Sequence, residues 1–208
     1  MAHYRKNYLC ICEGQQEKMY LEHVAGLLKE FPRKVIKFNT YIDNPHRLTK
    51  TYEEYDSAAL FDFDFNKVEF ERNIEICDRL KREHQPTSRK KGRSICHAYS
   101  SANFDLWLIL HKEDFNREVS RNDAYISDIR RIYELSSSCD IKSESVIKSI
   151  LTKITLLDVK AAIQRAEKIR NDKLRTDANI VGTSEIYSNP DFSIHEFLKT
   201  VLEDSGDL

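Results

Sequence analysis

The stretch Ser57-Ala-Ala-Leu-Phe-Asp-Phe-Asp-Phe65 decides the fold class, because it joins an apolar strand to two acids. Residues 58–63 form a short apolar run, which predicts a strand buried on both faces of a sheet. Strands of this kind are typical of parallel sheets that helices cover on both sides. Asp62 and Asp64 close the run, and we expect them to project to the same face, about 6–7 Å apart.

The flanking sequence extends this pattern in both directions. Residues 7–12, 35–42 and 94–99 are further predicted strands. Helical spacing of apolar residues covers 16–31 and 67–83, and residues 45–55 predict a short polar helix. Strands that alternate with helices predict an α/β layer with a largely parallel sheet.

The pattern changes after residue 101. Helices are predicted over residues 104–110, 123–135, 143–151, 156–173 and 193–203, and the polar residues 174–184 predict a mobile loop. Ser193 and Glu196 have the spacing of a capping box at the start of the last helix. We therefore expect an α/β core over residues 1–101 and a helical extension over residues 102–208 that packs on this core.

Composition limits the class of protein. The chain has 33 Lys and Arg against 34 Asp and Glu, so any nucleic-acid site must come from local charge rather than from a basic surface overall. No window approaches the roughly 20 apolar residues that cross a bilayer, and no signal peptide is evident at the N-terminus. The five cysteines show no C-x-x-C spacing. These features favour a reduced, cytoplasmic protein without a membrane partner.

A third acid, Glu13, directly follows the first predicted strand, and Gly14 then allows a tight turn. The carboxyl ends of neighbouring parallel strands form a ligand crevice, so Glu13, Asp62 and Asp64 would converge if the first and third strands are neighbours. Paired carboxylates need a proton or a cation between them. Oxygen donors without a His or Cys cluster favour Mg²⁺ or Mn²⁺, which commonly serve phosphoryl-transfer chemistry.

Structural explanations stay open for each of these acids. A single Glu-Gly after a strand is usually an ordinary turn, and Asp-x-Asp is often a helix cap or a solvated strand end. The joint placement of the acids after two strands of one α/β pattern is the stronger observation.

A basic segment over residues 79–93 is the candidate phosphate-binding surface. Clustered Lys and Arg are the electrostatic signature of phosphate binding, although a solvated loop explains most charge runs. The candidate nucleic-acid-binding residues are Arg79, Arg82, Arg89, Lys90, Lys91 and Arg93. We expect this segment to lie near the acids, because it connects the following helix to the fourth strand.

Several segments resemble one family. They are CEGQQEKMYLEHV (12–24), LFDFDFN (60–66), SSANFDLWLILH (100–111), AIQRAEKI (162–169) and SNPDFSIHEFL (188–198). Together they resemble the RloB-like proteins, a family related to the Toprim domain and linked to restriction loci and phage defence. The resemblance covers nearly the full length of the chain and implies a Toprim-like sheet.

The resemblance also implies a site. Glu13, Asp62 and Asp64 match the Toprim acids, and Asp105 stands where the family usually has Glu. Asp105 also begins an apolar helix, where a carboxylate favours the positive end of the helix dipole. Phe63 stands where Arg is frequent, so a phosphate contact from that position is missing.

The leading hypothesis is an Mg²⁺-dependent nuclease that cleaves RNA, including transfer RNA, or DNA in anti-phage defence. Asp62 and Asp64 would hold the metal, Glu13 would be a further ligand or the general acid/base, and Asp105 would complete the site. By resemblance, an ATPase encoded nearby is an expected partner, and self-association is left open. The alternative is a non-catalytic module of an ATPase-containing defence complex whose acids bind a structural metal. Other Toprim chemistries, strand passage and primer synthesis, lack an evident tyrosine domain or nucleotide pocket here.

Overall fold

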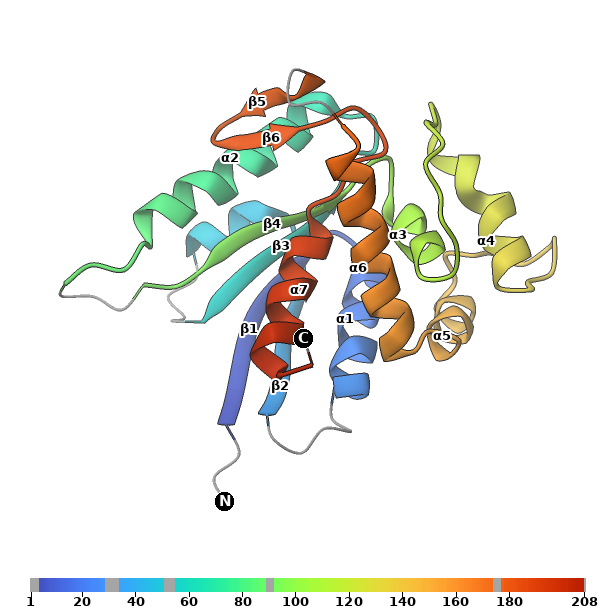
Figure 1. Cartoon of the computed structure of the whole chain (residues 1–208), viewed down its shortest axis with the longest axis horizontal. Helices are drawn as coiled ribbons and strands as arrows, with labels where there is room; N and C mark the ends of the chain where they lie inside the picture. The colour runs from blue at the N-terminus through green and yellow to red at the C-terminus, as the bar shows by residue number, and fades with distance from the viewer. Residues whose placement is uncertain (1–3, 29–33, 51–54, 89–91, 174–176, 208) are drawn as a thin grey trace.

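A four-stranded parallel sheet forms the centre of the molecule (Figure 1). The computed structural model describes residues 4–28, 34–50, 55–88, 92–173 and 177–207. The sheet order is β2-β1-β3-β4, with strands β1 (Tyr4–Cys12), β2 (Lys34–Ile42), β3 (Asp56–Asp62) and β4 (Ile95–Ser100). Strand β1 pairs with both β2 and β3, so the ends of β1 and β3 are neighbours, as the metal hypothesis requires.

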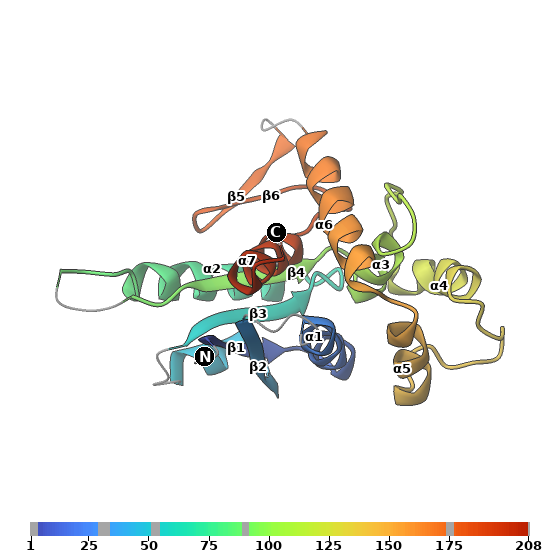
Figure 2. The ribbon, with the colours of Figure 1, turned by 60° about the horizontal axis from the view of Figure 1, so that its bottom comes forward.

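Helices cover both faces of this sheet (Figures 1 and 2). Alternate residues of β1 point to opposite faces, so Tyr8, Cys10 and Cys12 join one hydrophobic cluster and Leu9 and Ile11 join the other. The first cluster packs against helices α1 (Gln15–Leu28), α3 (Phe104–Leu110), α5 (Glu144–Thr152), α6 (Leu156–Asn171) and α7 (Ile194–Ser205). The second packs against α2 (Lys67–Glu83), the 3-10 helix η1 (Pro45–Lys50) and a hairpin of β5 (Asn179–Val181) and β6 (Ser184–Ile186).

The two halves of the chain share one core. Every residue of α3 is buried, and Trp107 lies in the same cluster as the α1 residue Tyr20, with ring centroids 6.5 Å apart. Helix α7 returns to the sheet, where Phe197 packs edge-on against Tyr8 of β1 at 5.6 Å. Residues 102–208 therefore complete the hydrophobic core of the sheet. No helix within the described residues is long and apolar enough to cross a bilayer.

The predicted α/β class and the largely parallel sheet are confirmed. The bounds predicted for residues 67–83 match α2, because Asn66 caps that helix by accepting a hydrogen bond from Glu69 N at 3.3 Å. The helix predicted over residues 123–135 is instead divided into η2 (Asn122–Tyr125) and α4 (Ile126–Ile132). Of the helix predicted over residues 45–55, η1 ends at Lys50, and residues 51–54 lie outside the described part.

Two predictions for the C-terminal part are wrong. The segment predicted as a loop contains the β5–β6 hairpin, whose two-residue turn places Gly182 at φ +61°, a conformation that glycine adopts without strain. Residues 174–176 of that segment lie outside the described residues. The Ser193 side chain makes no capping hydrogen bond to α7. It accepts one from Tyr99 N at 2.9 Å instead, so this serine joins α7 to β4.

Candidate active site

Glu13 and Asp62 are in direct contact at the carboxyl edge of the sheet. Cys12 at the end of β1 pairs with Leu60 of β3, and Glu13 N donates to Leu60 O at 2.9 Å. The pairing brings the glutamate side chain beyond the end of β3, where Glu13 Oε2 accepts a hydrogen bond from Asp62 N at 2.8 Å. The acids from two strands, 49 residues apart in sequence, therefore meet at this edge.

Asp62 has one oxygen with a partner and one without. Its Oδ2 accepts a hydrogen bond from Phe104 N at 3.0 Å, at the start of α3. Its Oδ1 is buried and has no hydrogen-bond partner among the described residues. A buried carboxylate oxygen without a donor is costly, so this atom is one to which a cation would bind favourably.

Asp64 reaches the same edge by a different backbone path from the one predicted. Strand β3 ends at Asp62, and Asp64 is in the left-handed region with φ +42°. The expectation that Asp62 and Asp64 share a face by strand alternation is therefore wrong. Asp64 N donates to Ala102 O at 2.9 Å, which fixes this exposed residue against the loop after β4.

Asp105 lies in the first turn of α3 and is only 1% exposed. Asn103 caps this helix and accepts a hydrogen bond from Asp105 N at 3.0 Å. Asp105 Oδ1 accepts hydrogen bonds from Gln16 Nε2 and from Lys142 Nζ, both at 3.1 Å. Its Oδ2 is buried and has no partner among the described residues.

Glu17, Gln16 and Lys142 are site residues that the sequence analysis missed. Glu17 is 5% exposed, and its Oε2 accepts a hydrogen bond from Gly14 N at 3.0 Å. The segment EGQQE carried a signal, because a Glu three residues after a Gly at a helix start reaches back to free backbone N–H groups. Lys142 lies between α4 and α5, and nothing in its local sequence indicated that it reaches Asp105.

The acids raise one another's pKa. Burial raises the pKa of Asp62 well above its ordinary value, and the charges of Glu17, Glu13 and Asp64 raise it further. Burial also raises the pKa of Glu13, with a contribution from Asp64, and raises the pKa of Glu17 to about 7. The pKa of Asp64 is raised by burial and by Asp105. Burial is the largest cause for each of these carboxyl groups, and the charges of neighbouring acids add to it.

The acids do not form a ready-made metal cage. Among the residues that the structure describes, no three His, Cys, Asp or Glu side chains are grouped closely enough to hold a metal ion. The buried, unpartnered oxygens of Asp62 and Asp105 nevertheless fit a hard cation. Mg²⁺ in proteins is commonly held by one or two carboxylates, with water and substrate phosphate oxygens completing its shell. The residues present fit that open type of site.

The described residues of the basic segment lie away from this edge, so the expectation that it is near the acids is wrong for them. Helix α2 starts next to the acids and has 17 residues, which at about 1.5 Å per residue carries its end about 25 Å away. Figures 1 and 2 show α2 running outward, away from α3, towards one side of the molecule. On this helix, Arg79 Nε lies 3.8 Å from Glu83 Oε1, and Arg82 is exposed in the last turn.

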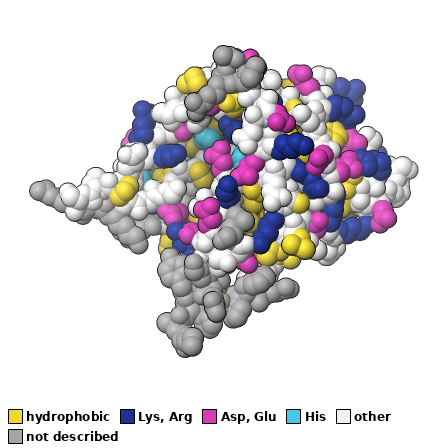
Figure 3. Space-filling model, in the orientation of Figure 1, with side chains coloured by type: hydrophobic (Ala, Val, Ile, Leu, Met, Phe, Trp, Pro, Cys, Tyr) yellow, Lys and Arg dark blue, Asp and Glu magenta, His cyan; other side chains and the backbone are white. Residues whose placement is uncertain are grey.

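Arg93, the last residue of the basic segment, contacts the end of α2. Arg93 is buried, with Nη2 3.3 Å from His84 Nε2 at the end of α2. Arg89, Lys90 and Lys91 lie outside the described residues. On the face drawn in Figure 3, basic and acidic side chains are interspersed and do not form a field of one sign. Lys142 therefore supplies the positive charge next to the acids.

Comparison with known families gives one match. The protein family described as RloB-like protein matches residues 8–200, which is most of the chain. The comparisons with curated proteins and with solved structures give no significant match. The matched range contains Glu13, Glu17, Asp62, Asp64, Asp105 and Lys142.

Proposed function

This chain belongs to the RloB-like protein family, and we propose that it is a divalent-metal-dependent nuclease whose active site is the carboxyl edge of the sheet. The observation that carries the proposal is the buried Asp62 Oδ1, which has no hydrogen-bond partner in the part of the chain that the structure describes. Burial and the charges of the neighbouring acids raise the pKa of the Asp62 carboxyl group. A divalent cation bound here would give the unpaired oxygen a ligand bond and would reduce the repulsion between the neighbouring carboxylates.

Asp62 and Asp64 are the proposed metal-binding residues, with Mg²⁺ or Mn²⁺ as the cofactor. When bound, the metal supplies charge stabilisation to a phosphodiester and lowers the pKa of a coordinated water. The left-handed backbone at Asp64 and its hydrogen bond to Ala102 O hold the second carboxylate at the edge without the constraint of the strand. The exposed position of Asp64 leaves room for substrate oxygens and water beside it.

Glu13 is the proposed general acid/base. Its pKa is raised by burial and by the charge of Asp64, which moves it towards the pH at which proton transfer is efficient. The hydrogen bond from Asp62 N to Glu13 Oε2 fixes the position of the carboxyl group beside the metal-binding residue. This contact gives Glu13 a defined place from which to transfer a proton to a leaving oxygen.

Lys142 is the proposed phosphate-binding residue, with Asp105 positioning it. The Lys142 side chain is 52% exposed, whereas the Asp105 carboxylate that holds it is buried. Gln16 Oε1 accepts a second hydrogen bond from Lys142 Nζ at 3.1 Å. The ammonium group is thus held at the site by buried partners while part of the side chain stays open to a phosphodiester.

The proposed biological setting is anti-phage defence, with an ATPase encoded nearby as partner. The test is to sequence the 5′ ends of RNA and DNA from phage-infected cells that express the chain with its neighbouring genes, either as wild type or as Glu13→Gln. New ends in the wild-type cells that disappear in the variant would support the nuclease. Equal ends in both strains, together with metal-dependent stabilisation of the purified protein, would instead support a non-catalytic module of the defence complex.

A further inference from the structure

A cavity adjoins the acid edge on the face of the sheet that α2 and the β5–β6 hairpin cover. This cavity, of about 160 Å³, lies between the start of α2, the β5–β6 hairpin and the loop over residues 187–191. We call it the hairpin pocket; its walls include Phe63, Lys67, Tyr99, Asn179, Tyr187 and Asn189. Phe63 stands between Asp62 and Asp64 in sequence, and its ring packs against Phe70 of α2 at 5.3 Å. The pocket is therefore lined by the residue that lies between Asp62 and Asp64 in the chain.

The chemistry of the walls suits a flat heterocycle. Phe63, Phe70, Tyr99 and Tyr187 give the pocket aromatic surface, and amide and hydroxyl groups from Asn179, Ser188 and Ser101 stand among them. Aromatic walls bind planar rings, and amides with hydroxyls pair with the donor and acceptor groups of a nucleobase edge. The volume is below the roughly 300–1,000 Å³ of sites for drug-sized ligands, so it fits one ring system.

The charged groups in the wall are already neutralised. Asp191 Oδ2 accepts hydrogen bonds from Tyr99 Oη at 2.5 Å and from Tyr187 N at 2.9 Å, and its Oδ1 lies 3.5 Å from Arg170 Nε. Lys67 Nζ forms an ion pair with Glu71 Oε1 at 3.6 Å. A pocket with balanced charges favours a neutral ring over a phosphate group.

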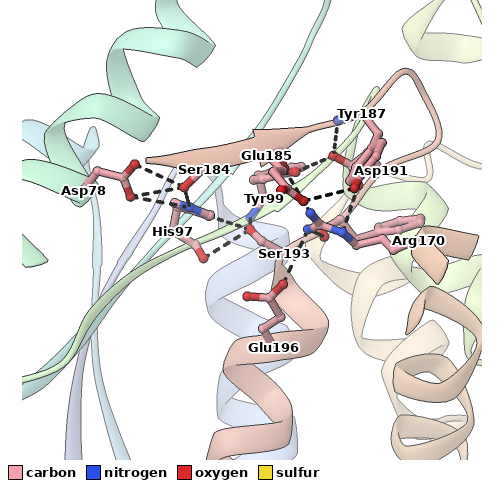
Figure 4. Close-up of polar contacts among 11 residues, drawn as sticks. Asp78, His97, Tyr99, Arg170, Ser184, Glu185, Tyr187, Asp191, Ser193 and Glu196 are labelled. Carbon is pink, nitrogen blue, oxygen red and sulfur yellow. Dashed lines mark hydrogen bonds and ion pairs between the residues drawn. The ribbon is translucent and has the colours of Figure 1, made fainter. Parts of the chain in front are cut away.

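The hairpin that forms one wall is fixed at its turn (Figure 4). Asp78 of α2 accepts hydrogen bonds from Thr183 N at 2.6 Å and from Ser184 Oγ at 3.1 Å. His97 of β4 joins Ser184 Oγ at 2.8 Å and Ser193 Oγ at 2.9 Å. A wall that is already ordered loses little conformational entropy when a ligand enters.

The other end of the hairpin is fixed by Arg170 of α6. Its Nη2 donates to Glu185 O at 3.0 Å and its Nη1 donates to Phe192 O at 2.6 Å, while the guanidinium lies over the Tyr187 ring at 5.3 Å. The Tyr187 ring is therefore held against the half-buried guanidinium of Arg170. The pocket is pre-formed on this side as well.

We propose that the hairpin pocket binds one nucleobase turned out of its strand while the adjoining phosphodiester lies at the acids. This inference rests on the proposed nuclease function and names its substrate class as unpaired nucleic acid. A base inside a duplex is stacked and paired and cannot enter a closed-backed pocket, whereas a base in a single strand or loop can be displaced at small cost.

The test measures binding in EDTA, where no metal-dependent cleavage occurs. The probe is a single-stranded oligonucleotide with one 2-aminopurine, whose emission changes when the base leaves its stacked neighbours; the same strand in a full duplex is the comparison. Asn179→Trp fills the mouth of the pocket from an exposed position, and Ile180→Trp, at a 68% exposed neighbour outside the pocket, is the matched control. Ser188→Trp blocks the same mouth from the opposite loop.

We expect the single strand to bind at least tenfold more tightly than the duplex, with an emission change that reports unstacking. We expect Asn179→Trp and Ser188→Trp to weaken single-strand binding about tenfold, towards the lower end of what stacking of one base contributes, and Ile180→Trp to leave it within twofold. Equal affinity of all three variants, or equal binding of duplex and single strand, would overturn the pocket assignment. Base binding without any cleavage after Mg²⁺ is added would contradict the nuclease and leave the pocket as a base-binding site.

Discussion

Asp62 and Asp78 are both aspartates with buried carboxylate oxygens, but they differ in the number of hydrogen bonds that these oxygens accept. Asp78 Oδ2 accepts hydrogen bonds from Thr183 N, Thr183 Oγ1 and Ser184 Oγ, at 2.6, 2.9 and 3.1 Å. Asp62 accepts one backbone hydrogen bond, its Oδ1 has no hydrogen-bond partner among the residues with described positions, and its neighbours include other acids. Asp78 holds the hairpin by these hydrogen bonds, whereas Asp62 is the residue for which we propose a metal ligand.

The largest difference between the two aspartates is expected in the rate of cleavage. We expect Asp62→Asn to lower the rate of metal-dependent cleavage roughly 10³-fold, because a metal supplies several kcal/mol of transition-state stabilisation and each 1.36 kcal/mol is tenfold in rate. Asp78→Asn should keep the rate per folded molecule within about threefold. The measurement is the initial rate on a single-stranded substrate with saturating Mg²⁺. Equal losses in both variants would show that the site does not depend on Asp62 specifically.

Substitution of Asp78 should lower the stability of the fold more than substitution of Asp62, the reverse of the order expected for catalysis. Asp78→Ala removes the acceptor for three donors of the hairpin, a loss of about 2 kcal/mol for hydrogen bonds to a charged group. We expect Tm to fall by about 4–8 °C, since 1 kcal/mol corresponds to about 2–4 °C in a chain of this size. Asp62→Asn should leave Tm of the metal-free protein unchanged or higher, because it removes a repelling charge. A larger fall for Asp62→Asn than for Asp78→Ala in thermal unfolding would contradict the comparison.

The pH dependence of stability follows from Glu17. Its folded pKa of about 7 lies above the ordinary value of 4.5, so between these values the folded protein binds more protons than the unfolded chain. Stability of the metal-free protein should therefore fall as pH rises from 5 to 7.5. Glu17→Gln removes this contribution and should raise Tm at pH 7.5 by about 2–4 °C, for about 1 kcal/mol.

The control for that experiment is Glu144→Gln on α5, where the glutamate is exposed and Lys148 lowers its pKa. Its Tm should follow the wild type at both pH values or fall slightly at pH 7.5. If Glu17→Gln also followed the wild type at both pH values, the raised pKa assigned to the buried Glu17 carboxyl group would be wrong.

The smallest effect is expected at Lys142. Lys142→Met removes the positive charge next to the acids and should weaken binding of a single-stranded oligonucleotide about fivefold, or about 1 kcal/mol. Lys148→Met is the matched control, because Lys148 pairs with Glu144 on an exposed helix face. Affinities measured at one salt concentration compare the two directly. Identical losses for both lysines would reduce Lys142 to a general surface charge.

The sequence was sufficient for the sheet because the predicted strands at residues 7–12 and 58–63 have fully buried centres, residues 8–12 and 58–61, with no competing helical period. It also placed Glu13 beside Asp62, since both follow neighbouring parallel strands. The conformation of Asp64 could not be read in the same way, because a strand pattern does not reveal where the backbone turns to a positive φ.

Contacts that depend on packing of distant segments were beyond the sequence. Lys142 contacts Asp105, which lies 37 residues earlier in the sequence. The turn of the hairpin at residues 179–186 is held by hydrogen bonds to Asp78, about 100 residues earlier. The basic segment was misplaced for a related reason, because its distance from the acids depends on the direction of α2 relative to the sheet. The density of Lys and Arg in the sequence indicated a basic surface, but it did not indicate at which edge of the sheet that surface lies.

Binding of Mn²⁺, followed by the loss of its free-ion electron paramagnetic resonance signal, tests the central claim most directly because it needs no substrate, partner or trigger. The account predicts that the wild type and Asp78→Asn bind Mn²⁺ at submillimolar concentration and that Asp62→Asn binds it at least tenfold more weakly. Equal Mn²⁺ binding by Asp62→Asn and the wild type, or no binding by the wild type at millimolar Mn²⁺, would contradict a metal site at the carboxyl edge of the sheet.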